Sequence, residues 1–186
     1  MRSGQATTIL RKEHDAILQM LDMAEEVARW LDHGERVAPE TLSGLLEILQ
    51  VFADRCHHTK EEDLLFPLLE KRGLPRDRGP IGVMLFEHEQ GRGFMRQMAE
   101  SAEAYARGAP GAGPRWAAAA RGYAELLRQH IFKENNILFR MAEQVLTAHE
   151  QEELAAAFDE AEEEKIGAGK RQRIHRLMDK LTAEIF

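Results

Sequence analysis

The side chains that could do chemistry are two pairs of histidine and glutamate, each pair spaced four residues apart. His57 precedes Glu61, and His130 precedes Glu134. In a helix, residues four apart lie one turn apart on the same face. The face of the first pair also carries apolar residues, which are Leu46, Leu49, Ala53, Leu64 and Leu68. Because a buried carboxylate without a partner is costly and a bound cation offsets that cost, the two pairs predict a metal site.

The four-residue spacing is not specific by itself. Four of the eight histidines are followed by glutamate four residues later. The pair His149 and Glu153 lies in a polar, acidic segment and is interpreted as a coincidence. The pair His58 and Glu62 lies about 100° around the helix from the apolar face. His58 and Glu62 are therefore alternative ligands rather than the first choice.

The elements that must position these residues are helices. Apolar residues recur at helical spacing in four long segments, at about residues 6–32, 39–71, 80–107 and 114–145. His33-Gly34 predicts the end of the first helix, and Pro67 predicts a kink or an end near Leu65. No strand-like alternation of β-branched residues occurs. We therefore predict an all-α, antiparallel up-down four-helix bundle in residues 1–145.

Residues 146–186 are expected to form a helical appendage. Thr147-Ala-His-Glu150 resembles a capping box that begins a fifth helix. Gly167-Ala-Gly169 separates this helix from a basic sixth helix at about residues 170–185. The acidic run at residues 160–164 is either a solvated face or an interaction tail. The appendage should pack on the bundle or on another chain, which allows a homodimer through the C-terminal helices.

Length and composition exclude several classes of function. A chain of 186 residues and 21.2 kDa can bury a sizeable core. Its formal net charge of −7 argues against nucleic acid as a partner. No apolar stretch is long enough to span a membrane, and the first eight residues lack the apolar core of a secretory signal. A single cysteine, Cys56, favours a reducing cytoplasm, and we interpret it as a small buried residue.

Each of the four long helices contributes one inward histidine. These are His14, His57, His88 and His130. Neutral imidazole together with carboxylate suits iron, manganese or zinc. Carboxylates on two helices can each bridge two metal ions, which favours a dinuclear site. On the fourth helix, Ile137 is expected on the same inward face as Glu134.

The order and placement of these residues resemble the hemerythrin-like, or HHE cation-binding, domain family. The resemblance covers about residues 8–145. Its motifs are Glu13-His14, His57-x-x-Lys-Glu61-Glu62-x-x-Leu-Phe-Pro67, Glu87-His88-Glu89 and His130-Ile-x-Lys-Glu134-Asn-Asn-x-Leu-Phe139. The resemblance implies a non-haem diiron centre. It also implies that His14 and His57 serve one iron, that His88 and His130 serve the other, and that Glu61 and Glu134 bridge them.

The sequence departs from the oxygen-carrying members of this family at two positions. Those proteins have a second histidine one turn after the third-helix histidine, where this chain has Arg92. They also have an aspartate on the fourth helix, where this chain has Glu134. The second iron therefore has an open position, a water, or a substitute such as His58 or Glu62. Arg92 should pair with a carboxylate near the site or extend to the bundle end, and Tyr123 is either an outer hydrogen-bond donor or a core aromatic residue.

Three functions are compatible with this pattern. The first is a diiron protein that binds or reacts with dioxygen, peroxide or nitric oxide, in sensing or in redox-stress handling; whether it turns over as an oxidoreductase stays open. The second is iron binding for storage, delivery or sensing without turnover. The third is a helical interaction protein whose inward histidines are fortuitous. Relatives that repair iron centres carry an additional cysteine-bearing segment, which this sequence does not show.

Overall fold

The computed structural model describes residues 5–186, apart from the side chains of Gln5 and Ala168. Residues 1–4, half of the stretch expected to lack a secretory signal, lie outside the described residues. Within residues 5–186 the secondary structure is helical and contains no strand. The prediction of an all-α fold with additional C-terminal helices is therefore confirmed.

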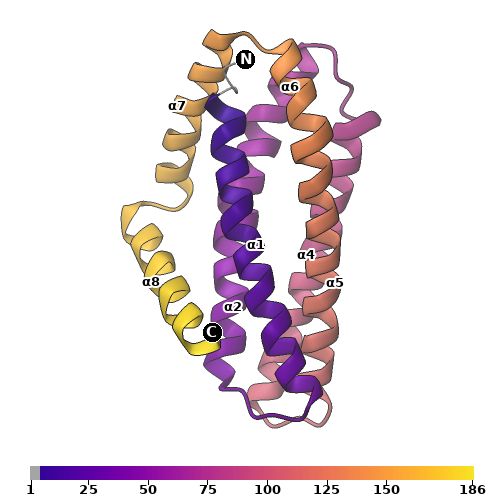
Figure 1. Cartoon of the computed structure of the whole chain (residues 1–186), viewed down its shortest axis with the longest axis vertical. Coiled ribbons are helices and arrows are strands. Elements are labelled where there is room, and N and C mark those ends of the chain that lie inside the picture. Colours follow the sequence, from indigo (N-terminus) through magenta and orange to yellow (C-terminus); the bar gives the residue numbers. More distant parts are fainter. Residues whose placement is uncertain (1–4) are drawn as a thin grey trace.

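Four long helical rods form the bundle (Figure 1). The first rod is α1 (Gln5–Asp32), and the third is α4 (Gly79–Ala106). The second rod runs through α2 (Pro39–Ile48), η1 (Leu49–His58), η2 (Lys60–Leu65) and α3 (Phe66–Lys71). The fourth rod runs through α5 (Ala112–Lys133), η3 (Glu134–Leu138) and α6 (Phe139–Val145). Short loops connect successive rods at alternate ends, as an up-down bundle requires.

The second rod is π-helical at His57, His58 and Glu61, and the fourth rod becomes π-helical at Glu134, directly after α5. In η1, η2 and η3 the backbone bonds span five residues instead of four, so the helix is wider and turns less per residue. The predicted break near Leu65 takes the form of a change from π to α geometry, and the rod continues to Lys71. Pro67 lies in the first turn of α3, where a missing N–H is tolerated.

The π-helical η3 also corrects one inward assignment. Ile137 was expected to face the core, but it is 47% exposed. Its neighbour Leu138 is fully buried instead. Because the π turns rotate the helix less per residue, the inward face after Glu134 shifts away from the position that α-helical spacing predicts.

The helix ends follow the signals in the sequence. Gly34 ends α1 with φ of 76°, in the left-handed region that suits glycine. The predicted capping box is confirmed at the start of α7 (Ala148–Lys165). The backbone N–H of Glu150 donates to Thr147 Oγ1 at 3.2 Å, and the backbone N–H of Thr147 donates to Glu150 Oε2 at 2.8 Å.

The apolar core consists of two clusters with a polar layer between them. One cluster occupies the half of the bundle around Trp116 and Tyr123. The other occupies the half around Phe66 and Phe139. The candidate ligands lie between the two clusters along every rod; for example, buried His14 lies between Leu10 of one cluster and Ile17 of the other. The site is therefore a polar layer enclosed above and below by apolar packing.

The C-terminal helices pack on the bundle. Helix α7 (Ala148–Lys165) contacts α1 and η2, and α8 (Ala168–Ile185) contacts α1 and α2. Both lie along one side of the bundle in Figure 1. Phe158 of α7 and Leu181 of α8 are buried. The division near residue 145 into bundle and appendage, and the homodimer through these helices, stay predictions.

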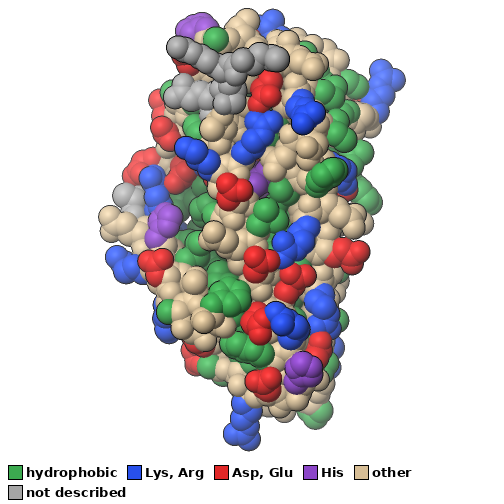
Figure 2. All heavy atoms as spheres, viewed as in Figure 1, with side chains coloured by type: hydrophobic (Ala, Val, Ile, Leu, Met, Phe, Trp, Pro, Cys, Tyr) green, Lys and Arg blue, Asp and Glu red, His purple; other side chains and the backbone are tan. Residues whose placement is uncertain are grey.

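The surface is charged and mixed. Figure 2 shows acidic and basic side chains interspersed over one face, without a broad area of one sign. In the described part of the chain, no helix has the length and apolar character needed to cross a bilayer.

Candidate metal centre

The fold brings the six first-choice ligands together in two overlapping groups. One group is His14, His57, Glu61 and Glu134. The other is Glu61, His88, His130 and Glu134. Within each group, one ligand atom per residue lies within 4.8 Å of the others, and every member is buried. The two carboxylates belong to both groups.

Glu61 directs one oxygen at each half of the site. Its Oε1 lies 3.7 Å from His57 Nε2, and its Oε2 lies 3.5 Å from His88 Nε2. One carboxylate therefore faces imidazoles of both groups, which is the arrangement that a bridging ligand needs.

Glu134 has the same arrangement from the opposite rod. Its Oε2 lies 3.1 Å from His14 Nε2, and its Oε1 lies 3.3 Å from His130 Nε2. His14 and His57 thus share one half of the site, and His88 and His130 share the other.

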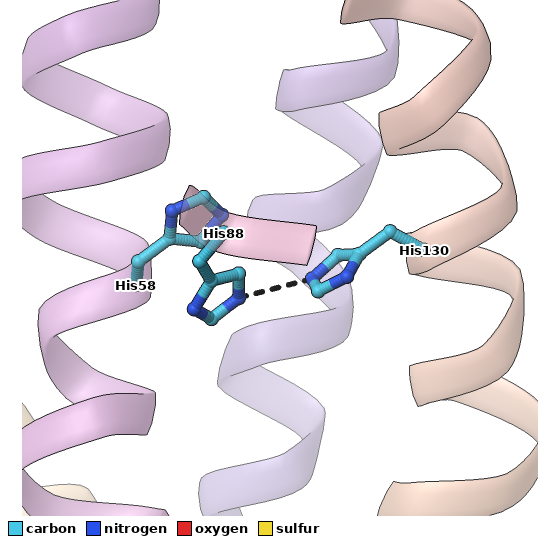
Figure 3. A group of neighbouring side chains, drawn as sticks. All are labelled: His58, His88 and His130. Atoms are coloured by element: carbon cyan, nitrogen blue, oxygen red, sulfur yellow. Dashed lines mark hydrogen bonds between the residues drawn. The ribbon is translucent and has the colours of Figure 1, made fainter. Parts of the chain in front are cut away.

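His58 also enters the site, on the side of His88 and His130. The three residues form a third group with ligand atoms within 4.8 Å of one another. Figure 3 shows the three side chains converging from separate helices, with His58 over His88. The rings of His58 and His88 stack with centroids 3.8 Å apart. The α-helical angle of 100° had placed His58 away from the core, and the slower rotation of the π-helical η1 brings it inward instead.

Most of the atoms that face the centre have no hydrogen-bond partner among the described residues. They are Nε2 of His14, His57 and His58 and both carboxylate oxygens of Glu61 and Glu134. Buried polar atoms are normally hydrogen-bonded, so such a cluster requires an explanation. Imidazole nitrogens and carboxylate oxygens, without thiolate, are ligands that iron, manganese and zinc accept. The donor atoms therefore fit a metal ion.

The outward nitrogen of every imidazole in the site is bonded to an acceptor. Each Nδ1 donates to a side-chain oxygen, which leaves Nε2 available as a ligand atom. The donor and acceptor pairs are His14 with Asn135 at 2.9 Å, His57 with Glu13 at 2.8 Å, His58 with Asp54 at 3.4 Å, His88 with Glu62 at 2.7 Å, and His130 with Glu87 at 3.0 Å. Glu62, considered above as a ligand, is therefore an orienting residue for His88.

These carboxylates are paired in turn with cations. Arg92 donates from Nε to Asp54 at 2.9 Å and from Nη2 to Glu62 at 2.7 Å. Of the two roles expected for Arg92, pairing near the site is the one observed. Lys60 pairs with Glu13, and Lys133 pairs with Glu87.

Two of these carboxylates, Glu13 and Glu87, had no role assigned from the sequence. Glu13 and Glu87 each directly precede an inward histidine, but each orients the histidine of a neighbouring rod: Glu13 bonds His57, and Glu87 bonds His130. The available signal was an acidic residue one position away from the inward face. Which histidine it reaches depends on the packing of the rods, which the sequence does not state.

Burial keeps several imidazoles neutral. Burial, followed by the neighbouring His14, lowers the pKa of His57 to about 4. Burial, followed by His58, lowers the pKa of His88 to about 3. Because neutral imidazole is the form that binds metal, these ligands need lose no proton near neutral pH.

Two other groups have raised pKa values when no metal is bound. Burial alone would lower the pKa of His130, but the carboxylates of Glu134 and Glu87 raise it to about 9. Burial, followed by the negative charge of Glu134, raises the pKa of Glu61 well above its ordinary value. His130 can then donate from Nε2 to His88 Nε2 at 3.1 Å (the dashed line in Figure 3).

Three residues discussed above lie outside the cluster. The hydroxyl of buried Tyr123 has no hydrogen-bond partner among residues 5–186, so the core aromatic interpretation is the one that fits. Cys56 is buried and forms no disulfide. The side chain of His149 is 79% exposed, as expected for a coincidental pair with Glu153.

A comparison with protein-family models identifies the domain. The model of the hemerythrin HHE cation binding domain matches residues 5–142. The chain belongs to this family. It is therefore a hemerythrin-like, metal-binding helical protein, and its buried histidine and glutamate cluster is the candidate metal site.

Curated relatives cover most of the chain. The iron-sulfur cluster repair protein YtfE of Edwardsiella ictaluri is 32% identical over 135 residues, which are 71% of this chain and 60% of the relative. YtfE of Yersinia pestis is 32% identical over 146 residues, covering 72% of this chain and 62% of the relative. An uncharacterized protein of Mycobacterium tuberculosis is 24% identical over 158 residues, covering 85% of this chain and 61% of the relative. This hemerythrin-like chain thus spans about three fifths of the length of these relatives.

Proposed function

We propose that this hemerythrin-like protein binds a dinuclear non-haem iron centre and reacts there with dioxygen, peroxide or nitric oxide, in sensing or in redox-stress handling. The observation that carries the proposal is the position of the two shared carboxylates. Glu61 and Glu134 each direct one oxygen at either half of the site, and those oxygens have no hydrogen-bond partner among the described residues. A mononuclear site would use one half and leave buried carboxylate oxygens unpaired in the other.

The ligand set differs between the two halves. His14 and His57 would serve one iron. His88, His130 and His58 would serve the other, with His58 in the role that the histidine missing at Arg92 has in oxygen-carrying relatives. Glu61 and Glu134 would complete both sets. The half with two imidazoles then has fewer protein ligands and more room for a small molecule.

The protein's own contribution is positioning and exclusion of water. Bound iron supplies one-electron oxidation and reduction at the site. The paired Nδ1 atoms fix the ring orientation of each imidazole. The apolar clusters above and below the polar layer limit water and strengthen the local electrostatic interactions. Only small ligands fit this environment, because every proposed ligand residue is nearly inaccessible to solvent.

A second candidate is iron binding for storage, delivery or iron-centre maintenance without turnover. The observation that favours it is the similarity to proteins named for iron-sulfur cluster repair. The match covers about three fifths of those relatives, so this function is proposed at the level of the shared domain. A reducing cytoplasm, which the single cysteine favours, suits either candidate.

The test is anaerobic reconstitution with ferrous iron. We expect elemental analysis to give about two iron ions per chain, as a dinuclear site requires. Dioxygen, peroxide or nitric oxide is then admitted while the visible spectrum and ligand consumption are followed. Repeated consumption supports an enzyme, a reversible adduct supports sensing or carriage, and a single one-way oxidation supports storage or delivery. Less than one iron per chain, with no spectral change, would remove the diiron proposal.

A further inference from the structure

A second polar cluster lies between the bundle and the C-terminal helix α7. Lys60 is only 2% exposed, and its Nζ donates to Glu162 Oε2 at 2.7 Å and also to Glu13 Oε1. Cys56 lies beside them, and the donor atoms of Glu13, Cys56 and Glu162 lie within 4.8 Å of one another. A metal could use such a donor set, but the ammonium group of Lys60 already supplies the positive charge. The cluster is therefore a buried ion-pair network and not a second metal site.

The network connects α7 and α8 to a proposed metal ligand. On one side, the second oxygen of Glu13 accepts from His57 Nδ1 at 2.8 Å. On the other side, the second oxygen of Glu162 pairs with Arg171 Nε of α8 at 2.9 Å. Five side chains from five elements thus form one continuous series, from Arg171 through Glu162, Lys60 and Glu13 to His57.

The other orienting carboxylates depend on cations of the bundle itself. Glu87 pairs with Lys133, and Asp54 and Glu62 pair with Arg92. Among the ion pairs of the described residues, the network at Lys60 is the one that joins an imidazole of the metal site to the C-terminal helices. The acidic run at residues 160–164 therefore contains a structural contact, and is not only a solvated face.

We propose that Glu162 is a positioning residue for His57, acting through Lys60 and Glu13, so that docking of the C-terminal helices tunes the affinity of the metal centre. The inference rests on the proposed function, because it treats His57 as a ligand. The physical reason is the sharing of one ammonium group between two carboxylates. Without the charge of Glu162, Lys60 interacts with Glu13 alone, and Glu13 then becomes a weaker acceptor for His57 Nδ1. A buried charge that loses one of its partners also destabilises its surroundings.

The first measurement uses the metal-free full chain. Nitrogen NMR of the histidine rings reports the tautomer of His57 and the hydrogen bond at its Nδ1, with the signals assigned through a His57→Gln variant. We expect Glu162→Gln to shift the Nδ1 proton of His57 upfield and to increase its exchange with water. Glu160→Gln is the matched control, because Glu160 is an exposed residue of the same helix and the charge change is identical.

The second measurement uses Zn²⁺ in competition with a coloured chelator. Loss of an outer partner of a metal-binding histidine typically costs about 10–100-fold in affinity. Because Glu162 acts through two intermediates, we expect the Zn²⁺ dissociation constant to rise about tenfold in Glu162→Gln, at the lower end of that range. Glu162→Asp, which retains the carboxylate, should restore most of the affinity, and Glu160→Gln should resemble the wild type.

Two outcomes overturn the inference. One is a His57 signal in Glu162→Gln that matches the wild type, and the other is an equal shift in Glu160→Gln. If Glu162→Gln fails to fold, Arg171→Gln decides instead, because it removes the α8 partner of Glu162 and leaves Lys60 paired. Glu162 without Arg171 should attract Lys60 more strongly and leave Glu13 a stronger acceptor, so Arg171→Gln should shift the Nδ1 proton of His57 downfield, opposite to Glu162→Gln. No shift, or an upfield shift, rejects the inference. A wild-type protein that binds no metal would reject the proposed function, whereas the metal-free NMR still decides the coupling.

Discussion

His58 is the alternative ligand that the structure brings into the site, beside His88 and His130. It was expected outside the apolar face, and it lies inside, stacked on His88 and bonded through Nδ1 to Asp54. Its Nε2 has no partner among the described residues. A buried imidazole whose Nδ1 is hydrogen-bonded and whose Nε2 has no partner is oriented to act as a metal ligand.

We predict that His58→Gln weakens the binding of one of the two metal ions. Losing an outer partner of a ligand costs about 10–100-fold in metal affinity, so loss of the ligand itself should cost at least that much for the ion near His88 and His130. Anaerobic titration with ferrous iron, followed by elemental analysis after gel filtration, measures the change. We expect about two iron ions per chain in the wild type and close to one in the variant.

The matched control is His149→Gln. His149 also has glutamate four residues later, but its side chain is 79% exposed. The metal content of this variant should equal that of the wild type. Equal losses of iron in both variants would show that the effect is not specific to the site. An iron content in His58→Gln equal to that of the wild type would show that His58 is not a ligand and that His88 and His130 are the only imidazoles in that half of the site.

Cys56 should be unreactive in the folded protein. Burial, opposed in part by Lys60, raises the pKa of its thiol to about 12. Thiolate is the nucleophile, so at pH 8 the thiolate fraction is roughly a thousandfold below that of an ordinary thiol with a pKa of 9.0. We expect a disulfide reagent such as Ellman's reagent to react with unfolded chain at once and with native protein at least about a thousandfold more slowly.

The single cysteine makes this measurement unambiguous, because all of the colour reports Cys56. Glu162 of helix α7 lies beside the thiol, with a carboxylate oxygen within 4.8 Å of the sulfur. A native reaction as fast as the unfolded one would show that α7 opens readily. That result would also weaken the argument that α7 positions His57.

At the scale of elements, the sequence predicted the rods well and their internal geometry poorly. Apolar periodicity, Gly34 and the Thr147 capping box mark helix ends within a few residues of the observed ones. The π-helical stretches leave no such signal, because their residues have ordinary helical propensities and the wider turns depend on tertiary contacts. The inward or outward orientation of His58 and Ile137 was therefore predicted wrongly, because it depends on the rotation per residue. His57 and Glu61 were correctly predicted to face the core.

The packing of α4 against α5 offers a test that is independent of metal. A Cβ added at Gly122 would lie 2.4 Å from Phe94 Cε1, so the ring must move. Overpacking of this kind costs about 1–3 kcal/mol, and the better helix propensity of alanine returns about 1 kcal/mol. We expect Gly122→Ala to lower the free energy of unfolding by about 1 kcal/mol, measured by urea denaturation of the metal-free protein.

Gly93→Ala is the same substitution but should raise the free energy of unfolding instead of lowering it. Gly93 is also in the interior of a helix, but the nearest atom to an added Cβ is Arg96 Nη2 at 3.8 Å, at the end of a flexible side chain. Because no clash opposes it, the better helix propensity of alanine should raise the free energy of unfolding by roughly 0.8–1 kcal/mol. If both variants are stabilised, Phe94 moves away at little cost and the contact between the helices is looser than the structure indicates.

At the scale of the whole molecule, the polar layer interrupts an otherwise continuous apolar interior. Four histidines, a fifth added by η1, and two glutamates occupy positions that apolar residues could fill. Without metal, the surrounding carboxylates raise the pKa of His130 to about 9, and burial together with Glu134 raises the pKa of Glu61, so both groups favour their protonated forms. Such an arrangement stabilises the fold less than apolar packing would, so its presence is better explained by binding than by stability.

Metal binding should therefore release protons and stabilise the fold together. The pKa of His130 is about 9 when no metal is bound, so this imidazole carries a proton near neutral pH that a metal must displace. The raised pKa of Glu61 acts in the same direction. As the pH falls below about 9, protons compete better for these ligand atoms, so the apparent metal affinity decreases. One displaced proton changes it about tenfold per pH unit, and two displaced protons about a hundredfold.

Calorimetry with Zn²⁺ in buffers of different ionisation enthalpy counts the protons directly, and we expect at least one to be released near pH 7, from His130. Saturation at a hundred times the dissociation constant should raise the free energy of unfolding by about 2.7 kcal/mol per site, and a chelator should reverse the gain. The alternative of a helical interaction protein makes the opposite prediction. If chelator leaves the melting temperature unchanged and no protons are released, the histidines and glutamates of the polar layer bind no cation, because a metal that displaces buried protons cannot bind without both effects.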